Sequence, residues 1–211
     1  PEGIDPNSGE KYNILPSTWA FKCKRFPDGL IKKFKARFCA RGDKQIAGVD
    51  YFDTYAPVVQ WITIRLMLIL ECLLSLVSKQ GDVTCAFLHA ELPKDENVYI
   101  QMPQGFKQYD KGGNAKVLKL KRTLYGLKQS PRAFWKYVTE KLELCGMEQS
   151  DLDPCLFIGE KVICVVYVDD LLFWSTEEDH IVSLAEALRL EGVDLEEEGD
   201  AAGFLGVKLE R

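Results

Sequence analysis

Residues 162–174 read V-I-C-V-V-Y-V-D-D-L-L-F-W, so two adjacent aspartates, Asp169 and Asp170, lie among eleven apolar residues. Strands that are apolar on both faces are expected inside a protein, and this run predicts two of them joined by a tight hairpin. Asp is common at such turns because it tolerates turn geometry. Neighbouring carboxylates in an apolar setting nevertheless repel each other and lose hydration. Two interpretations follow: a purely structural turn, or a site for a divalent cation that compensates both charges.

The rest of the pattern predicts an α+β fold with antiparallel strands and a few helices packed on one side. Residues 17–43 predict two strands joined by a turn at 27–29. Residues 62–78 predict a helix, and Arg65 and Glu71 favour a buried amphipathic helix over a membrane span. Further expected elements are strands near 80–92, 98–106, 153–174 and 202–210, a strand early in 115–146, a helix starting at Ser130-Pro131, and an amphipathic helix over 177–190.

The charge is distributed unevenly along the chain. The formal net charge is −5, but residues 21–45 carry +7, residues 111–139 carry eight basic and no acidic residues, and residues 177–211 carry −8. In residues 33–37 the basic side chains alternate with apolar ones, which predicts one basic face of a strand. Such zones fit either a cleft for a polyanion or simple hydrated surfaces.

Cysteine and histidine usage argues against a zinc site. The seven cysteines form no C-x-x-C pair, and the chain has only two histidines. Scattered, unpaired cysteines indicate a reducing compartment. The chain shows no signal-peptide pattern, and because it starts with Pro rather than Met we expect it to be a segment of a longer polypeptide.

Asp82, in Q-G-D-V-T-C-A-F, is the best candidate for a third carboxylate. It lies at the end of a predicted strand, before a turn, and it is the only acid between Glu71 and Glu91. Three carboxylates would allow a two-metal site, in which paired ions stabilise the attacking and leaving oxygens of a displacement.

Six blocks, in this order, resemble the reverse transcriptase of copia-type LTR retrotransposons along nearly the whole chain. They are K-A-R-F-C-A-R-G-D-K-Q, G-V-D-Y-F-D-T-Y-A-P-V-V, D-V-T-C-A-F-L-H-A-E-L, V-Y-I-Q-M-P-Q-G-F, L-Y-G-L-K-Q-S-P-R-A-F-W and Y-V-D-D. The resemblance implies a right-hand polymerase fold, with an antiparallel palm sheet packed on helices and a β-rich fingers lobe. The implied domains are fingers (1–58), palm (59–91), fingers (92–121) and palm (122–211), without thumb or RNase H.

The resemblance also implies the catalytic centre. Asp82, Asp169 and Asp170 would be the catalytic aspartates and would hold two Mg²⁺ ions, with Mn²⁺ as a substitute. Asp82 and Asp169 would ligate both ions, Asp170 would contribute more weakly, and the Val83 carbonyl would join the nucleotide-side ion. No lysine lies between residues 161 and 208, so the general-acid lysine of related polymerases has no counterpart here.

The resemblance implies nucleotide and template contacts as well. The implied nucleotide-binding residues are Lys35, Arg37, Phe87 and Gly126, with Arg41 as an alternative one step along the basic strand. Phe87 matches the bulky residue that excludes a 2′-hydroxyl. Tyr125 stands where retroviral relatives carry glutamine, and it receives no role. The implied template–primer residues are Tyr167, Lys128, Arg132 and Gly206.

The resemblance implies RNA-directed DNA synthesis, with an RNA template, a DNA primer and deoxynucleotides as partners and no membrane. It also implies a Gag-Pol polyprotein with integrase and RNase H, working in cytoplasmic virus-like particles whose product is destined for the nucleus. Two alternatives stay open: an inactive nucleic-acid-binding or structural palm module, and another two-metal palm enzyme such as an RNA polymerase or nucleotidyl cyclase.

Overall fold

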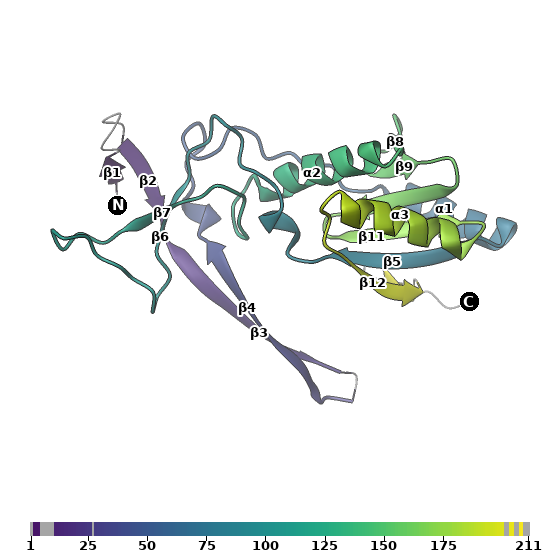
Figure 1. Ribbon diagram of the computed structural model, residues 1–211, viewed down its shortest axis with the longest axis horizontal. Helices are drawn as coiled ribbons and strands as arrows, with labels where there is room; N and C mark the ends of the chain where they lie inside the picture. Colours follow the sequence, from purple (N-terminus) through teal and green to yellow (C-terminus); the bar gives the residue numbers. More distant parts are fainter. Residues whose placement is uncertain (1, 5–10, 27, 201–202, 205–206, 209–211) are drawn as a thin grey trace. The chain divides into compact units, whose positions relative to one another are not determined.

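The computed structural model describes residues 2–4, 11–26, 28–200, 203–204 and 207–208 (Figure 1). The chain divides into two compact units, each built from two stretches of sequence. The first unit comprises residues 1–55 and 90–133, and the second comprises residues 56–89 and 134–211. Whether these units correspond to fingers and palm stays a prediction.

The second unit is built on a six-stranded antiparallel sheet with strand order β12-β5-β11-β10-β9-β8. The strands are β5 (Val77–Val83), β8 (Glu148–Gln149), β9 (Leu156–Ile158), β10 (Val162–Tyr167), β11 (Asp170–Ser175) and β12 (Leu195–Asp200). The apolar run 162–174 therefore forms β10, a two-residue turn and β11, as predicted.

Helices cover both faces of this sheet, so the expectation of helices on one side was wrong. Leu172 and Trp174 of β11 pack in a core cluster with Ile64 and Met67 of α1 (Trp61–Leu74). Phe173, which points the opposite way, lines a small cavity with residues of α3 (Glu178–Leu190). Figure 1 shows α3 lying across β11 and β5. The physical reason is that β11 is apolar on both faces and must be covered on both.

Helix α1 differs from its prediction in length and burial. It ends at Leu74 because Ser75 adopts a left-handed conformation with φ 52°, and β5 begins at Val77. One face of α1 is buried at Thr63, Ile64 and Met67. The opposite face exposes a stripe of apolar side chains: Ile62, Leu66, Ile69 and Leu73. Among the described residues, no helix is long and apolar enough to cross a membrane.

The first unit contains two small sheets. In one, β1 (Glu2–Ile4), β2 (Lys11–Leu15), β6 (Tyr99–Gln101) and β7 (Val117–Lys119) lie in that order, with β2 and β6 parallel. The other is the hairpin of β3 (Ser17–Arg25) and β4 (Ile31–Ala40), which confirms the two strands predicted within 17–43. Leu15, Ala40, Val98, Ile100 and Leu127 form the core of this unit. A short 3₁₀ helix, η1 (Gly42–Lys44), follows β4.

The remaining elements are mostly where the pattern predicts them. Helix α2 (Ser130–Leu144) begins at Ser130, and α3 closely matches the predicted 177–190 helix. The strand expected over 98–106 is only the three residues of β6. The closing strand is a short antiparallel pair, β13 (Gly203–Phe204) and β14 (Val207–Lys208).

Candidate active site

Two of the predicted aspartates meet across the central strands of the second unit. β5 and β11 pair so that Asp82 lies directly opposite Asp170. Directly opposed residues of an antiparallel pair share one face of the sheet. Strand alternation places Asp170 on the same face as Leu172 and Trp174, which is the face that α1 covers. Asp82 and Asp170, both half-buried, therefore belong to one surface.

Asp169 lies in the turn that connects β10 to β11, which the pairing of Tyr167 with Asp170 closes. Val168, the first turn residue, has φ 55°. A positive φ at the first central residue is typical of a type II′ turn, where Gly is usual, so a β-branched residue there carries about 1–3 kcal/mol of strain. The Val83 N–H donates to the Asp169 carbonyl at 2.8 Å. This bond ties the turn to the end of β5, so the backbone brings all three aspartates to one place.

The carboxylates at the ends of β5 and β11 are of the ligand type that Mg²⁺ prefers. Mg²⁺ is commonly held by one or two protein carboxylates together with substrate phosphates. The opposed pair Asp82 and Asp170 supplies two carboxylates, and Glu196 of β12 lies opposite Asp82 on its other side. Within the part of the chain that the structure describes, no three His, Cys, Asp or Glu side chains are already gathered to hold a metal. The protein thus offers neighbouring carboxylates that substrate oxygens would have to complete.

Phe87 lies in the same unit, within the short helix that follows β5. Cys85 adopts φ 54° and starts the 3₁₀ helix η2 (Ala86–Leu88), which reverses the chain after β5. The Phe87 ring packs edge-on against the buried Phe134 of α2, with ring centroids 6.2 Å apart. Phe87 remains half-buried, so part of its ring is accessible beside the aspartates' strand. Its role as a selector of sugars stays a prediction.

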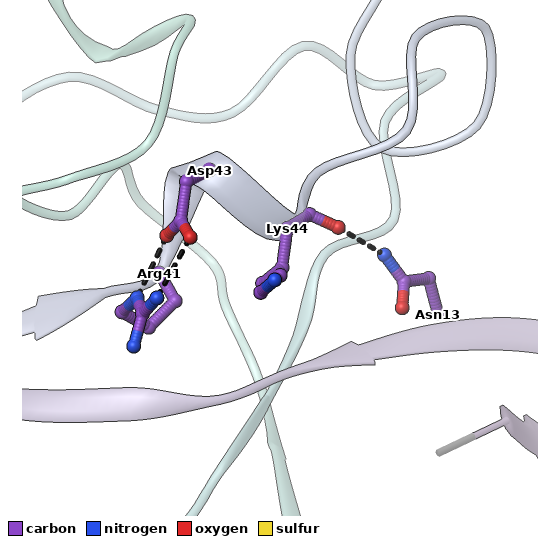
Figure 2. Close-up of polar contacts among 4 residues, drawn as sticks. All are labelled: Asn13, Arg41, Asp43 and Lys44. Carbon is purple, nitrogen blue, oxygen red and sulfur yellow. Dashed lines mark hydrogen bonds and ion pairs between the residues drawn. The ribbon is translucent and has the colours of Figure 1, made fainter.

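The other predicted nucleotide-binding residues lie in the first unit. Lys33, Lys35 and Arg37 alternate along β4, which confirms the predicted basic face. Arg41 is already engaged, because its guanidinium makes two 2.7 Å hydrogen bonds to the Asp43 carboxylate (Figure 2). This hydrogen bond is the largest of the causes that lower the pKa of the Asp43 carboxyl. The Arg41 guanidinium is therefore already engaged by a carboxylate of the protein.

Gly126 sits where no other residue fits. It has φ +91°, and a Cβ built on it would lie 2.2 Å from the Ala40 carbonyl oxygen. A Cβ on Gly42 would in turn lie 1.9 Å from the Gly126 oxygen. The loop before α2 and the end of β4 therefore touch backbone to backbone. The nucleotide-binding role implied for Gly126 stays a prediction.

The predicted template contacts have protein partners in this structure. The Arg132 guanidinium forms a 2.6 Å ion pair with Asp53 and donates to the Tyr55 carbonyl. The Lys128 ammonium lies 4.9 Å from the Tyr51 ring centroid and 3.2 Å from its hydroxyl. The predicted contacts of both with template–primer stay predictions.

Tyr167 and Gly206 complete the predicted template–primer set. Tyr167 packs at the margin of the α1-facing core cluster, beside Asp170. Gly206 lies outside the residues that the structure describes.

Sequence reasoning missed a buried polar network in the first unit. Gln129 is 1% exposed, and its amide donates to the Glu96 carboxylate at 2.9 Å and to the Asp50 carbonyl at 3.0 Å. Gln45 donates to Gln129 and accepts from the Lys128 N–H. Burial raises the pKa of Glu96, and its bonds from Gln129 and the Phe52 N–H oppose that rise. Gln45, Asp50 and Gln129 each stand in a different one of the six blocks, so these blocks serve the architecture of the unit.

Comparison with known proteins gives a consistent family match. A family profile described as "Reverse transcriptase (RNA-dependent DNA polymerase)" matches residues 6–211. The Pol polyprotein of transposon TNT 1-94 from Nicotiana tabacum is 33% identical over 202 residues, covering 93% of this chain and 15% of that protein. The transposon RE1 polyprotein of Arabidopsis thaliana is 33% identical, covering 94% and 13%. The predicted resemblance to copia-type reverse transcriptases is confirmed.

A yeast transposon polyprotein agrees with this match. The Ty1-H Gag-Pol polyprotein of Saccharomyces cerevisiae is 33% identical over 180 residues, covering 82% of this chain and 9% of that protein. A solved foamy viral protease-reverse transcriptase in complex with double-stranded DNA covers 85% of this chain and 25% of its own, at 15% identity and a TM-score of 0.39. The chain therefore spans only about one seventh or less of the length of the polyproteins it matches.

Proposed function

The chain belongs to the reverse transcriptase (RNA-dependent DNA polymerase) family, and on this premise we propose that it extends a DNA primer on an RNA template. The reaction joins the primer 3′-oxygen to the α-phosphorus of an incoming deoxynucleotide and releases pyrophosphate. The observation that supports the proposal is that the backbone pairs Asp82 with Asp170 across β5 and β11 and bonds the Val83 N–H to the Asp169 carbonyl.

Three aspartates would hold the metal ions of the reaction. Asp82 and Asp170 would ligate through side chains on one face of the sheet, Asp169 would ligate from the turn, and the Val83 carbonyl would add an oxygen. When bound, two Mg²⁺ ions would make the primer hydroxyl easier to deprotonate and would neutralise charge on the departing pyrophosphate. The role of the protein is positioning, and paired strands buried on both faces hold the aspartates rigidly.

Phe87 would select deoxynucleotides. Its ring packs edge-on against the ring of Phe134, so it cannot easily move aside for a bulky substituent on the sugar. A 2′-hydroxyl pressed against a fixed ring costs binding energy that a 2′-hydrogen does not. Lys35 and Arg37 of β4 would bind the triphosphate through charge-assisted hydrogen bonds.

Primer extension on an RNA template with Mg²⁺ tests the proposal. The chain should extend the primer, and Asp169→Asn should lose at least about 1,000-fold in rate, because charge stabilisation of the transferred phosphate is a main source of catalysis. Asp151→Asn, which alters an exposed carboxylate elsewhere in the second unit, should extend normally. Equal rates for Asp169→Asn and the unmodified chain would refute the assignment.

Sugar selection separates a DNA polymerase from another two-metal palm enzyme. The unmodified chain should prefer dTTP over UTP, and Phe87→Ala should narrow that preference. Equal use of both nucleotides by the unmodified chain would favour an RNA polymerase. An inactive descendant would instead bind RNA–DNA hybrid in a salt-dependent way without any extension.

The wider setting is part of the same proposal. The relatives are named Pol or Gag-Pol polyproteins of transposons. We infer that this chain likewise works beside an integrase and an RNase H, within cytoplasmic virus-like particles, on a product destined for the nucleus.

A further inference from the structure

Tyr125, which the sequence left without a role, lies against a predicted phosphate-binding arginine. The centre of the Arg37 guanidinium is 5.1 Å from the centroid of the Tyr125 ring. This distance is within the range of a cation–π interaction. Arg37 comes from β4 and Tyr125 from the loop that precedes α2, and both belong to the first unit.

The backbone around this pair leaves it little freedom. The Ala40 N–H donates to the Tyr125 carbonyl at 2.8 Å. Immediately beyond, Gly126 and Gly42 pack so closely against neighbouring backbone that neither could carry a Cβ without a shift of the chain. Because β4 and the loop are in close contact at this point, the backbone positions from which the ring and the guanidinium extend are fixed relative to each other.

One nitrogen of the Arg37 guanidinium makes no hydrogen bond to a described residue. This nitrogen is Nε, and it is buried. A buried donor of a charged group without a partner is costly, and hydrogen bonding at this nitrogen does not orient the guanidinium, which leaves the ring of Tyr125 as a contact that can. Arg41 differs from Arg37, because its Nε and one terminal nitrogen both donate hydrogen bonds to the Asp43 carboxylate (Figure 2).

We propose that Tyr125 is a positioning residue that holds the Arg37 guanidinium in place for the triphosphate of the incoming nucleotide. This inference rests on the proposed polymerase function. The flat, forked guanidinium binds phosphate oxygens in pairs only when its plane is oriented, and the ring of Tyr125 supplies that orientation before the substrate arrives. Tyr125 acts through its aromatic face, whereas a glutamine in its place could act only through hydrogen bonds.

Steady-state primer extension with dTTP distinguishes these two modes of action. Tyr125→Leu should raise the KM for dTTP by about 3- to 10-fold, the cost of ordering one long side chain on binding, and leave kcat within about 2-fold. Tyr125→Phe keeps the ring face and should restore the unmodified KM. A KM that rises equally in Tyr125→Phe would show that the hydroxyl, and not the ring, does the work, and it would overturn the proposal.

A double-mutant cycle tests whether Tyr125 acts through Arg37. In an Arg37→Ala background, Tyr125→Leu should have no further effect on KM, because the group it positions is gone. Additive effects of the two substitutions would contradict the proposal. Tyr99→Leu is a matched control, since Tyr99 carries the Lys119 ammonium 5.7 Å from its ring in the same unit and should leave KM unchanged.

A binding measurement without catalysis keeps this inference separate from the proposed function. Calorimetric titration with inorganic tripolyphosphate should show a several-fold weaker Kd for Tyr125→Leu and an unchanged Kd for Tyr125→Phe. Loss of extension by the unmodified chain, with this binding pattern intact, would count against the polymerase proposal alone. Equal Kd values for all variants, or no binding by the unmodified chain, would overturn the inference about Tyr125.

Discussion

Gly126→Ala is the substitution whose cost the structure specifies best. Gly105 provides a matched control, because its φ of +89° nearly equals the +91° of Gly126 while a Cβ on it would meet no atom within 4 Å. Placing alanine in this backbone region costs about 1–2 kcal/mol at either position. The two substitutions therefore share the conformational cost and differ in the contact with Ala40.

The contact adds a second cost at Gly126. An alanine Cβ would lie 2.2 Å from the Ala40 oxygen, so the loop would have to withdraw from β4 by about 1 Å to reach van der Waals distance. Withdrawal stretches the 2.8 Å bond from the Ala40 N–H to the Tyr125 carbonyl. Weakening that bond and overpacking the site together add about 2–4 kcal/mol.

Urea denaturation followed by circular dichroism measures the difference. Gly126→Ala should lose about 2–4 kcal/mol more of the free energy of unfolding than Gly105→Ala, or about 4–16 °C more in thermal midpoint. Equal losses at the two positions would show that β4 and the loop are not in contact, and the reasoning about Gly126 would fail.

Three further outcomes are expected. In Mg²⁺-free buffer Asp82→Asn should raise the free energy of unfolding by about 0.2–1 kcal/mol, because it removes a like charge directly opposite Asp170; urea denaturation checks this, and a decrease would contradict the pairing. Burial raises the pKa of Glu96, so the folded protein binds that proton more tightly than the unfolded chain does. Its contribution to stability should therefore decline as pH rises above the unfolded value of 4.5, and Glu96→Gln should remove that component from denaturation curves measured across this range. Trp174→Phe should cost about 1–3 kcal/mol in thermal unfolding, because the indole N–H donates to the Glu71 carboxylate at 2.9 Å; a loss below about 0.5 kcal/mol would show that this bond is not made.

Local pattern predicted the elements that are buried on both faces or strongly amphipathic. The β10–β11 hairpin follows from an uninterrupted apolar run with a turn-forming pair at its centre, and α3 follows from its helical period. Short strands such as β6 were overestimated, because three residues of pairing leave almost no periodic signal.

The contacts that define the candidate site were harder to predict. Nothing in the local sequence shows that Gln129 is buried against Glu96 or that Tyr125 faces Arg37, since each pair joins segments far apart in the chain. The exposed stripe on α1 escaped prediction for a related reason, because an apolar helix looks the same whether one face or its whole circumference is covered.

The sequence by itself determined the family, the apolar strands and the chemical types available for catalysis, because these depend on residue identity and on periods of a few residues. Only the tertiary structure decided that Asp82 lies opposite Asp170 and that the Val83 N–H bonds the Asp169 carbonyl. The physical reason is that strand register is set by pairing between distant segments, and a shift of one residue would have turned the Asp82 carboxylate to the other face of the sheet.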